Sequence, residues 1–428
     1  MVTTRLYQSD VYTRNWVAKV AISKNEDTYT AEMDRSAFFP EGGGQSCDTG
    51  KIKVTSGGNS FCFDVTDVQE DGERVLHTLK PTEPAEVPDD ILEKELDAEC
   101  SLDWDRRFDN MQRHCGEHIL SGIFYAECGG VNRGFHMGED YMTIDISLED
   151  EPTNPDMSKP EVVDDAMALH CELLANRVIW SNAPVTVMRF DTREEAEKLP
   201  LRKKLAFDED ISIVCVGSPE NAADCVACCG THPATAGQVG LIKIFKVENY
   251  KGMFRIYCEA GQRALRDYDM KHSMLTDLSN SYSSSIEDFP SKIRAQEEKI
   301  ASLKDDLTHA KRALTDVECA GLDEMLAVGE GKVVVQPLQH FTMDDAFNMA
   351  KRYMGKPTCC GKLILLYSVK DTSYILVSEG DPHCGQLVKE YANFYNGKGG
   401  GNDTSARAIF TNEEDAALFA DLLKKHLQ

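Results

Sequence analysis

The chain has 428 residues, of which 42% are hydrophobic and 28% are charged, the composition of an ordinary globular protein long enough for two or more domains. The formal net charge of −26 argues against a protein that coats nucleic acid indiscriminately, although a local basic surface can still bind phosphates. No apolar run approaches the roughly 20 residues that span a bilayer. Residues 1–5 lack the apolar core of a signal peptide, so we expect a cytoplasmic protein.

Residues 1–95 have the pattern of a β-rich domain. Short runs of strand-forming residues at 17–22, 28–33 and 51–54 are separated by turns, and we expect a small barrel-like fold. Residues 81–88 are rich in Pro and Glu and predict a connector to the next domain.

Residues 96–265 mix helical and strand patterns and are predicted to form an α+β domain. An apolar stripe that includes Met111, Ile119 and Phe124 predicts a helix over 109–124, and a second helix is expected over 161–177. Strands are expected at 141–146, 177–180, 185–188, 211–216, 241–245 and 254–257.

Residues 266–320 are predicted to form a helical hairpin that bends near 288–290. Apolar residues recur every seven positions in its second half, at Ile293, Ile300, Leu307 and Leu314. This stripe either packs on its own domain or forms a coiled coil. A homodimer through the hairpin or the C-terminal domain is therefore one of our expectations.

Residues 321–428 alternate strands and helices, as in an α/β domain. Strands are expected at 332–335, 363–367 and 374–377, and helices at 344–354 and 413–426. The predicted fold class of the whole chain is therefore α+β, with a β-rich N-terminal domain, an α+β core, a helical linker and a C-terminal α/β domain.

Two pairs of metal-binding residue types stand about a hundred residues apart. His114 and His118 are four apart, which places both on one face of the predicted helix. Cys228 and His232 have the same spacing around a turn that contains Gly230. Three imidazoles and a thiolate suit Zn²⁺ better than other common cellular metals, so we predict one zinc ion per chain.

The remaining cysteines leave the ligand set open at this point. Cys225 and Cys229 are rivals to Cys228 as the thiolate ligand. The chain has 15 cysteines without a regular framework, so we expect reduced thiols and a metal site rather than disulfides.

Three blocks of the chain resemble the editing domain of alanyl-tRNA synthetases and its free-standing AlaX relatives. They are a Gly-Gly-Gln loop at 38–50, the helix segment 105–121 and the segment 224–244. Residues 321–428 resemble the DHH-associated domain that follows this editing domain, including its Gly-rich motif. Because the first of these motifs begins near residue 36, we expect no aminoacylation domain upstream, and the chain resembles the long form of AlaX.

The resemblance implies hydrolysis of mischarged Ser-tRNA(Ala), with Gly-tRNA(Ala) as a second candidate substrate. It selects Cys228 as the thiolate ligand beside His114, His118 and His232. Four ligands favour, by count alone, a closed structural zinc site. We nevertheless expect zinc to help place the aminoacyl end and its attacking water. Ser36 and Gln45 are the candidates for sensing the serine hydroxyl, and the family often has threonine at the position of Ser36.

Other polar residues receive weaker predictions. Candidate tRNA contacts are Arg106, Arg113, Arg133, Lys398, Gly399 and Gly400, where the last three form a Gly-rich segment that either cradles a phosphate or is a flexible loop. Further basic candidates are Arg107 and the run 202–204. We expect structural roles for His77, Glu117 and His136, whereas Asp145 is a candidate for orienting a zinc-bound histidine.

Two alternatives remain open from the sequence. The first is a deacylase for another mischarged tRNA such as Ser-tRNA(Thr), because bacterial threonyl-tRNA synthetase editing domains have a similar ligand set. The second is a zinc-stabilised module that binds tRNA without hydrolysing anything. These alternatives differ in whether mischarged tRNA loses its amino acid at catalytic amounts of protein.

Overall fold

The computed structural model describes residues 1–25, 28–83, 87–206, 208–328 and 331–428. The chain divides into two compact units, Met1–Leu278 and Ser279–Gln428. Within the described residues, none of the helices combines the length and apolar character needed to cross a bilayer.

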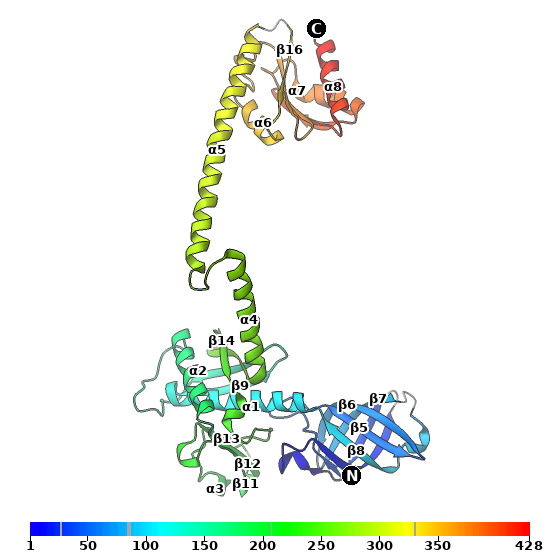
Figure 1. Cartoon of the computed structure of the whole chain (residues 1–428), viewed down its shortest axis with the longest axis vertical. Coiled ribbons are helices and arrows are strands. Elements are labelled where there is room, and N and C mark those ends of the chain that lie inside the picture. Colours follow the sequence, from blue (N-terminus) through cyan, green and yellow to red (C-terminus); the bar gives the residue numbers. More distant parts are fainter. Residues whose placement is uncertain (26–27, 84–86, 207, 329–330) are drawn as a thin grey trace. The chain divides into compact units, whose positions relative to one another are not determined.

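The N-terminal part of the first unit is a closed six-stranded barrel (blue in Figure 1). Its strands in barrel order are β2 (Asn15–Asn25), β3 (Thr28–Met33), β7 (Arg74–Glu83), β6 (Asn59–Asp71), β5 (Gly50–Ser56) and β8 (Glu95–Leu102). Alternate side chains such as Val20 and Ile22 point inward and are fully buried. The prediction of a barrel-like domain is confirmed. Part of the connector predicted at 81–88, residues 84–86, lies outside the described residues.

The helix that carries the first histidine pair connects the barrel to the rest of the unit. This helix, α1 (Trp104–Cys128), is longer than the predicted 109–124, because the residues that start and end it lie outside the apolar stripe. The side chain of Asp103 accepts a hydrogen bond from the Arg106 backbone N–H at the start, and Gly129 ends the helix with a φ of 66°.

Two antiparallel sheets complete the first unit. One has the order β14 (Ile242–Tyr250), β15 (Met253–Ala260), β10 (Met142–Leu148), β9 (Gly130–Met137). The other has the order β11 (Val185–Thr192), β12 (Glu209–Val216), β13 (Asp224–Ala227). Other elements of this unit are α2 (Asp165–Trp180), α3 (Arg193–Ala196), the part of α4 (Gly261–Tyr282) up to Leu278, and the short paired strands β1 (Thr4–Arg5) and β4 (Arg35–Ser36).

Two predictions for this unit are wrong. The strand expected at 177–180 is the last turn of α2, where Ile179 is buried against the core and packing overrides its preference for strands. The expectation of reduced thiols fails at one pair, because Cys215 on β12 and Cys225 on β13 are directly opposite in the register and form a disulfide.

The second unit contains a long helix and a five-stranded mixed sheet. The helices are α5 (Phe289–Val328), α6 (Met343–Ala350), α7 (Cys384–Tyr391) and α8 (Glu413–His426). The sheet order is β16 (Val333–Leu338), β17 (Leu363–Ser368), β18 (Ser373–Val377), β20 (Ser405–Ile409), β19 (Lys398–Gly401). Only β16 and β17 pair in parallel.

The Gly-rich segment of this unit is ordered as an edge strand, which excludes the flexible-loop interpretation. Lys398–Gly401 pairs with β20, and a Cβ atom at Gly399 would lie 1.8 Å from the Arg407 carbonyl oxygen. Glycine is therefore required there for close backbone approach.

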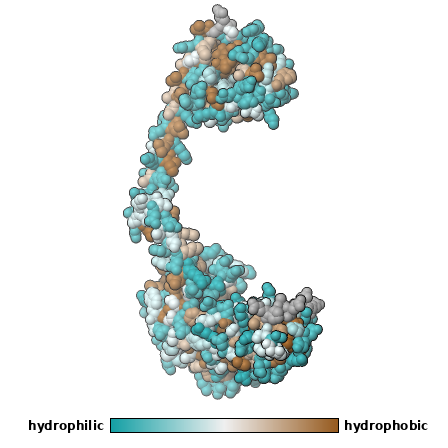
Figure 2. All heavy atoms as spheres, turned by 45° about the vertical axis from the view of Figure 1, so that its right-hand side comes forward, coloured by the Kyte–Doolittle hydropathy of each residue, from teal (hydrophilic) through white to brown (hydrophobic). Residues whose placement is uncertain are grey.

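The heptad stripe of α5 divides between two environments. Leu314 packs against the core of the C-terminal unit, whereas Ile300, Leu303 and Leu307 are about half exposed. Hydrophobic residues accordingly show at the surface along α5 (Figure 2). Homodimer formation through this stripe stays a prediction.

Candidate metal centre

The four predicted metal ligands converge in the first unit. His114 and His118 come from α1, whereas Cys228 and His232 belong to the loop that follows β13. Their donor atoms all lie within 4.8 Å of one another. The Cys228 Sγ atom is 3.5 Å from His114 Nε2 and 3.3 Å from His232 Nε2. This arrangement forms a group that can hold a metal ion.

The rival cysteines do not join the group. Cys225 is bonded to Cys215, and Cys229 is exposed. The structure therefore separates the three neighbouring cysteines into a disulfide partner, a member of the donor group (Cys228) and a surface thiol.

Side-chain oxygens behind the histidines of α1, one hydrogen-bonded and one in an ion-pair contact, determine which ring nitrogen faces the group. His114 Nδ1 lies 3.0 Å from Gln45 Oε1, and His118 Nδ1 lies 3.1 Å from Asp224 Oδ2. Both Nε2 atoms are thereby directed toward Cys228. Such acceptors orient metal-binding imidazoles and increase their basicity.

The charges of the group interact strongly. Burial raises the pKa of the Cys228 thiol, but the charges of the three histidines outweigh burial and lower this pKa well below its ordinary value. Burial also opposes the charge on His118, yet the Cys228 thiolate and Asp224 raise the pKa of His118 to about 10. Burial lowers the pKa of His232 to about 4, and its Nδ1 has no hydrogen-bond partner among the described residues. These shifts favour the cation-binding forms of Cys228 and His232, whereas His118 must release a proton when a cation binds.

The Gly-Gly-Gln loop packs against the Cys228–His232 loop. Gln45 is buried; its Oε1 accepts from the Thr231 backbone N–H at 3.0 Å, and its Nε2 donates to Thr231 Oγ1 at 2.8 Å. Gln45 therefore connects His114 to the loop that carries the other two ligands. Gly230 lies against His114 so closely that a Cβ atom there would be 2.2 Å from His114 Cε1.

Ser36 occupies a different environment. It is fully buried, and its Oγ lies 2.9 Å from His77 Nε2 and accepts from the Phe38 backbone N–H at 3.1 Å. Among the described residues, it belongs neither to the donor group nor to the wall of the cavity above that group. A contact between Ser36 and substrate stays a prediction.

A cavity of about 390 Å³ opens above the donor group. Its wall includes His114, His118 and Cys228, together with Gly43, Gly44, Glu117, Phe135 and Lys203. Glu117 Oε1 accepts from Ser121 at 2.5 Å and from Asn132 at 2.6 Å, consistent with the expected structural role. Its Oε2 lies 3.9 Å from His118 Nε2.

The predicted tRNA contacts are scattered. Arg113 is buried in an ion pair with Glu259, at 2.6 Å, so its guanidinium is engaged within the fold. Arg106 donates from Nε to the Cys47 carbonyl at 2.9 Å. Arg133 is exposed and paired with Glu149. Lys398, Gly399 and Gly400 are exposed on the edge strand β19.

One orienting carboxylate was missed by the sequence reasoning. Asp145 does not orient a histidine because it pairs with Arg255 at 2.7 Å. Asp224 takes that position beside His118 and also pairs with the largely buried Arg202 at 2.5 Å. Its place four residues before Cys228, at the start of β13, was the available signal.

Two family models match the chain. Residues 211–257 match the second additional domain of threonyl and alanyl tRNA synthetases, which includes Cys228 and His232. Residues 330–428 match the DHHA1 domain. These matches cover the loop half of the donor group and the C-terminal sheet.

Similar proteins span the whole chain. The alanyl-tRNA editing protein AlaX-L of Pyrococcus horikoshii is 30% identical over 99% of both chains. AlaX-M of Methanosarcina acetivorans is 31% identical over 58% of this chain and 94% of its own. The alanine–tRNA ligase of Pyrobaculum calidifontis is 26% identical over 96% of this chain but only 43% of its own. Because the similarity to AlaX-L extends over both chains almost completely, this chain belongs to the AlaX family of alanyl-tRNA editing proteins.

Proposed function

We propose that this protein hydrolyses the ester bond of seryl-tRNA(Ala), and of glycyl-tRNA(Ala), at a zinc site formed by His114, His118, Cys228 and His232. The observation that carries the proposal is the convergence of these donors beneath a cavity in a chain of this family. The names of its relatives, alanyl-tRNA editing proteins, support the same substrate class.

Zinc fits the donor group in chemistry, and two of the donor spacings match it. A tetrahedral zinc ion, with Zn–S of about 2.3 Å and Zn–N of about 2.0–2.1 Å, sets sulfur and nitrogen donors about 3.6 Å apart. The Cys228 Sγ lies 3.5 and 3.3 Å from two of the Nε2 atoms. When bound, zinc supplies Lewis-acid polarisation at the floor of the cavity.

The protein residues supply positioning. An aminoacyl ester is already activated, so holding it beside a water molecule in a fixed orientation is an effective route to hydrolysis. Gln45 and Asp224 fix the two histidines of α1, and the walls of the cavity limit the orientations of the ester. We propose that Gln45 contributes to serine recognition through this framework and that Ser36 supports it through His77.

Selectivity for serine over alanine follows from hydrogen bonding. The correct amino acid differs from serine only by the absence of a hydroxyl group. A site built around that hydroxyl rejects the analogue lacking it by about 10⁴-fold or more. We therefore expect Ala-tRNA(Ala) to be spared.

The test is hydrolysis of Ser-, Gly- and Ala-tRNA(Ala), with Ser-tRNA(Thr) as a fourth substrate, by zinc-loaded protein. A Cys228→Ala, His232→Ala double variant should lose activity, whereas Cys360→Ala, which removes an exposed thiol of the C-terminal unit, should retain it. Retention of all four esters by the wild-type protein would contradict the proposal. Faster hydrolysis of Ser-tRNA(Thr) than of the tRNA(Ala) esters would identify tRNA(Thr) as the preferred substrate.

A further inference from the structure

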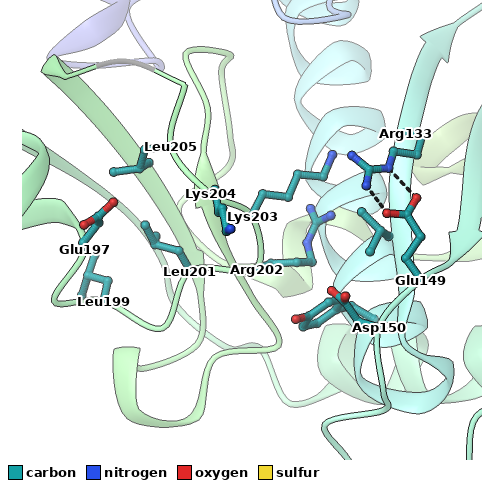
Figure 3. Close-up of a pocket in the computed structure, with 12 residues that line it drawn as sticks. Arg133, Glu149, Asp150, Glu197, Leu199, Leu201, Arg202, Lys203, Lys204 and Leu205 are labelled. Carbon is teal, nitrogen blue, oxygen red and sulfur yellow. Dashed lines mark hydrogen bonds and ion pairs between the residues drawn. The ribbon is translucent and has the colours of Figure 1, made fainter.

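The cavity above the donor group shares a wall with a larger cleft. This outer cleft has a volume of about 790 Å³ and lies between the segment 197–205 and strand β9 with the two residues that follow β10 (Figure 3). Arg133, Arg202 and Lys203 line both spaces, so they form the boundary between them. A ligand that extends from the outer cleft to the metal group must pass these three cations.

The charge of this boundary is only partly neutralised by the fold. The Arg202 side chain is 95% buried and donates to Asp224 from Nε and Nη2, but its Nη1 is buried without a partner among the described residues. No hydrogen bond or ion pair with a described residue holds the Lys203 ammonium. Figure 3 shows Lys203 and Arg133 pointing toward each other.

The position of the two basic residues is fixed by the backbone. The Arg202 N–H donates to the Cys225 carbonyl at 2.9 Å, which places the segment beside β13 and its following ligand loop. Burial, and the charge of Arg202, lower the pKa of Lys203, although Glu117 and Asp224 act in the opposite direction. An anion between Lys203 and Arg202 would relieve this unfavourable placement of like charges.

The outer cleft also suits a nucleobase. Its wall carries an aromatic ring, Tyr125, and the apolar side chains Leu199 and Leu201. Bases stack on aromatic and apolar walls while cations bind the backbone of a single strand. With a net charge of −26 for the whole chain, a local cluster of this kind is the feature that would attract a polyanion.

We propose that Arg202 and Lys203, assisted by Arg133, bind the phosphodiester on the 5′ side of the aminoacylated nucleotide. The preceding nucleotide then occupies the outer cleft, and the ester enters the cavity above the donor group. This inference rests on the proposed function and adds the path of the acceptor strand. It assigns to Lys203 a positioning role, because it holds the phosphate and not the reacting ester.

The experiment compares Lys203→Gln with Lys94→Gln. Lys94 is an exposed lysine of the barrel domain that lines neither cavity, and its substitution changes the net charge equally. Three substrates are used: Ser-tRNA(Ala), the seryl ester of the terminal dinucleotide with one phosphodiester, and the seryl ester of the terminal nucleoside with none. Metal content is measured for each variant to establish that the donor group is intact.

We expect Lys203→Gln to lower kcat/KM for the tRNA and dinucleotide esters by about 10–100-fold, the loss of a charge-assisted hydrogen bond. The nucleoside ester should be hydrolysed at the wild-type rate, Lys203→Arg should restore most of the loss, and Lys94→Gln should resemble the wild type. The salt dependence of uncharged tRNA binding should also fall, by about 0.7 in the logarithmic slope.

Equal losses on the dinucleotide and nucleoside esters, or no loss on either, would overturn the inference. If the wild-type protein hydrolyses none of the three esters, the proposed function fails. The phosphate site is then still decided by the salt slope of uncharged tRNA binding, where an unchanged slope in Lys203→Gln contradicts it. The two failures are therefore distinguishable.

Discussion

Replacing Gly230 by alanine tests whether the metal centre depends on close packing between its two halves. Gly230 lies between Cys228 and His232 in the chain and against the ring of His114 in space. An added Cβ atom would be 2.2 Å from His114 Cε1 and 2.3 Å from Nδ1. Either the imidazole or the ligand loop must move, so a metal donor is displaced whichever one yields.

The required displacement is large for a metal site. Ordinary van der Waals contact begins near 3.4 Å, so the ring and the new methyl group must separate by about 1.2 Å more. Metal–ligand distances tolerate only about ±0.2 Å. Overpacking of this kind costs about 1–3 kcal/mol of folding free energy. Removing an orienting partner of a metal ligand lowers metal affinity by about 10–100-fold, and we expect a loss of that size or more here.

The assay is competition for zinc between the purified protein and a chelator of known affinity, with thermal unfolding measured in parallel. Gly42→Ala is the matched control, because it adds the same methyl group in the neighbouring loop with nothing within 4 Å. Gly42→Ala should bind zinc as the wild type does. If Gly230→Ala also binds zinc as tightly as the wild type, the packing argument is wrong.

Three further predictions follow from buried groups. Asp224→Asn should weaken zinc binding by about 10–100-fold in the same chelator competition, because the carboxylate that orients His118 is lost; unchanged affinity would contradict this role. His77 is buried and its pKa is lowered by burial to about 4, so the protein should lose up to about 3 kcal/mol of unfolding free energy as the pH falls from about 6.5 to 4, measured by denaturant titration. The loss is in this direction because the unfolded chain binds the proton more readily, and His77→Gln should remove this part of the pH dependence. Arg113→Met should lower the unfolding free energy by about 3–5 kcal/mol by leaving Glu259 buried without its partner, whereas Arg113→Met combined with Glu259→Leu should recover much of it.

Capping residues and apolar periodicity predicted helices and strands correctly where they agreed with the packing of the core. Helix α8 begins and ends at the predicted residues because Asn412 caps it, acidic residues occupy its first turn and basic residues its last. The barrel strands likewise alternate inward and outward as their sequence does. Residues 177–180 were misassigned because their β-branched side chains favour a strand, and only the surrounding core makes the helical position of Ile179 preferable.

The donor group was predictable from spacing, but its supporting residues were not. Asp145 and Asp224 both lie on strands, and the one local difference is that Asp224 stands four residues before Cys228. The register of β10 against β15 places Asp145 opposite Arg255, whereas β13 delivers Asp224 to α1. Which carboxylate meets a histidine is therefore decided by strand pairing across more than a hundred residues.

The barrel contributes to the metal centre without providing a metal ligand. Its Gly-Gly-Gln loop is anchored to α1 by Arg107 and Asp48, both fully buried, which lie 2.5 Å apart. Arg107 also donates to the Ala37 carbonyl, so the loop is held on both sides of Gln45. A buried ion pair adds little net stability, but losing one partner is costly, so such a pair fixes one relative placement of the two elements. That placement brings the Gln45 amide to His114 and Thr231. The position of the barrel therefore determines the orientation of a metal ligand, and the barrel and the metal-binding core form one functional unit.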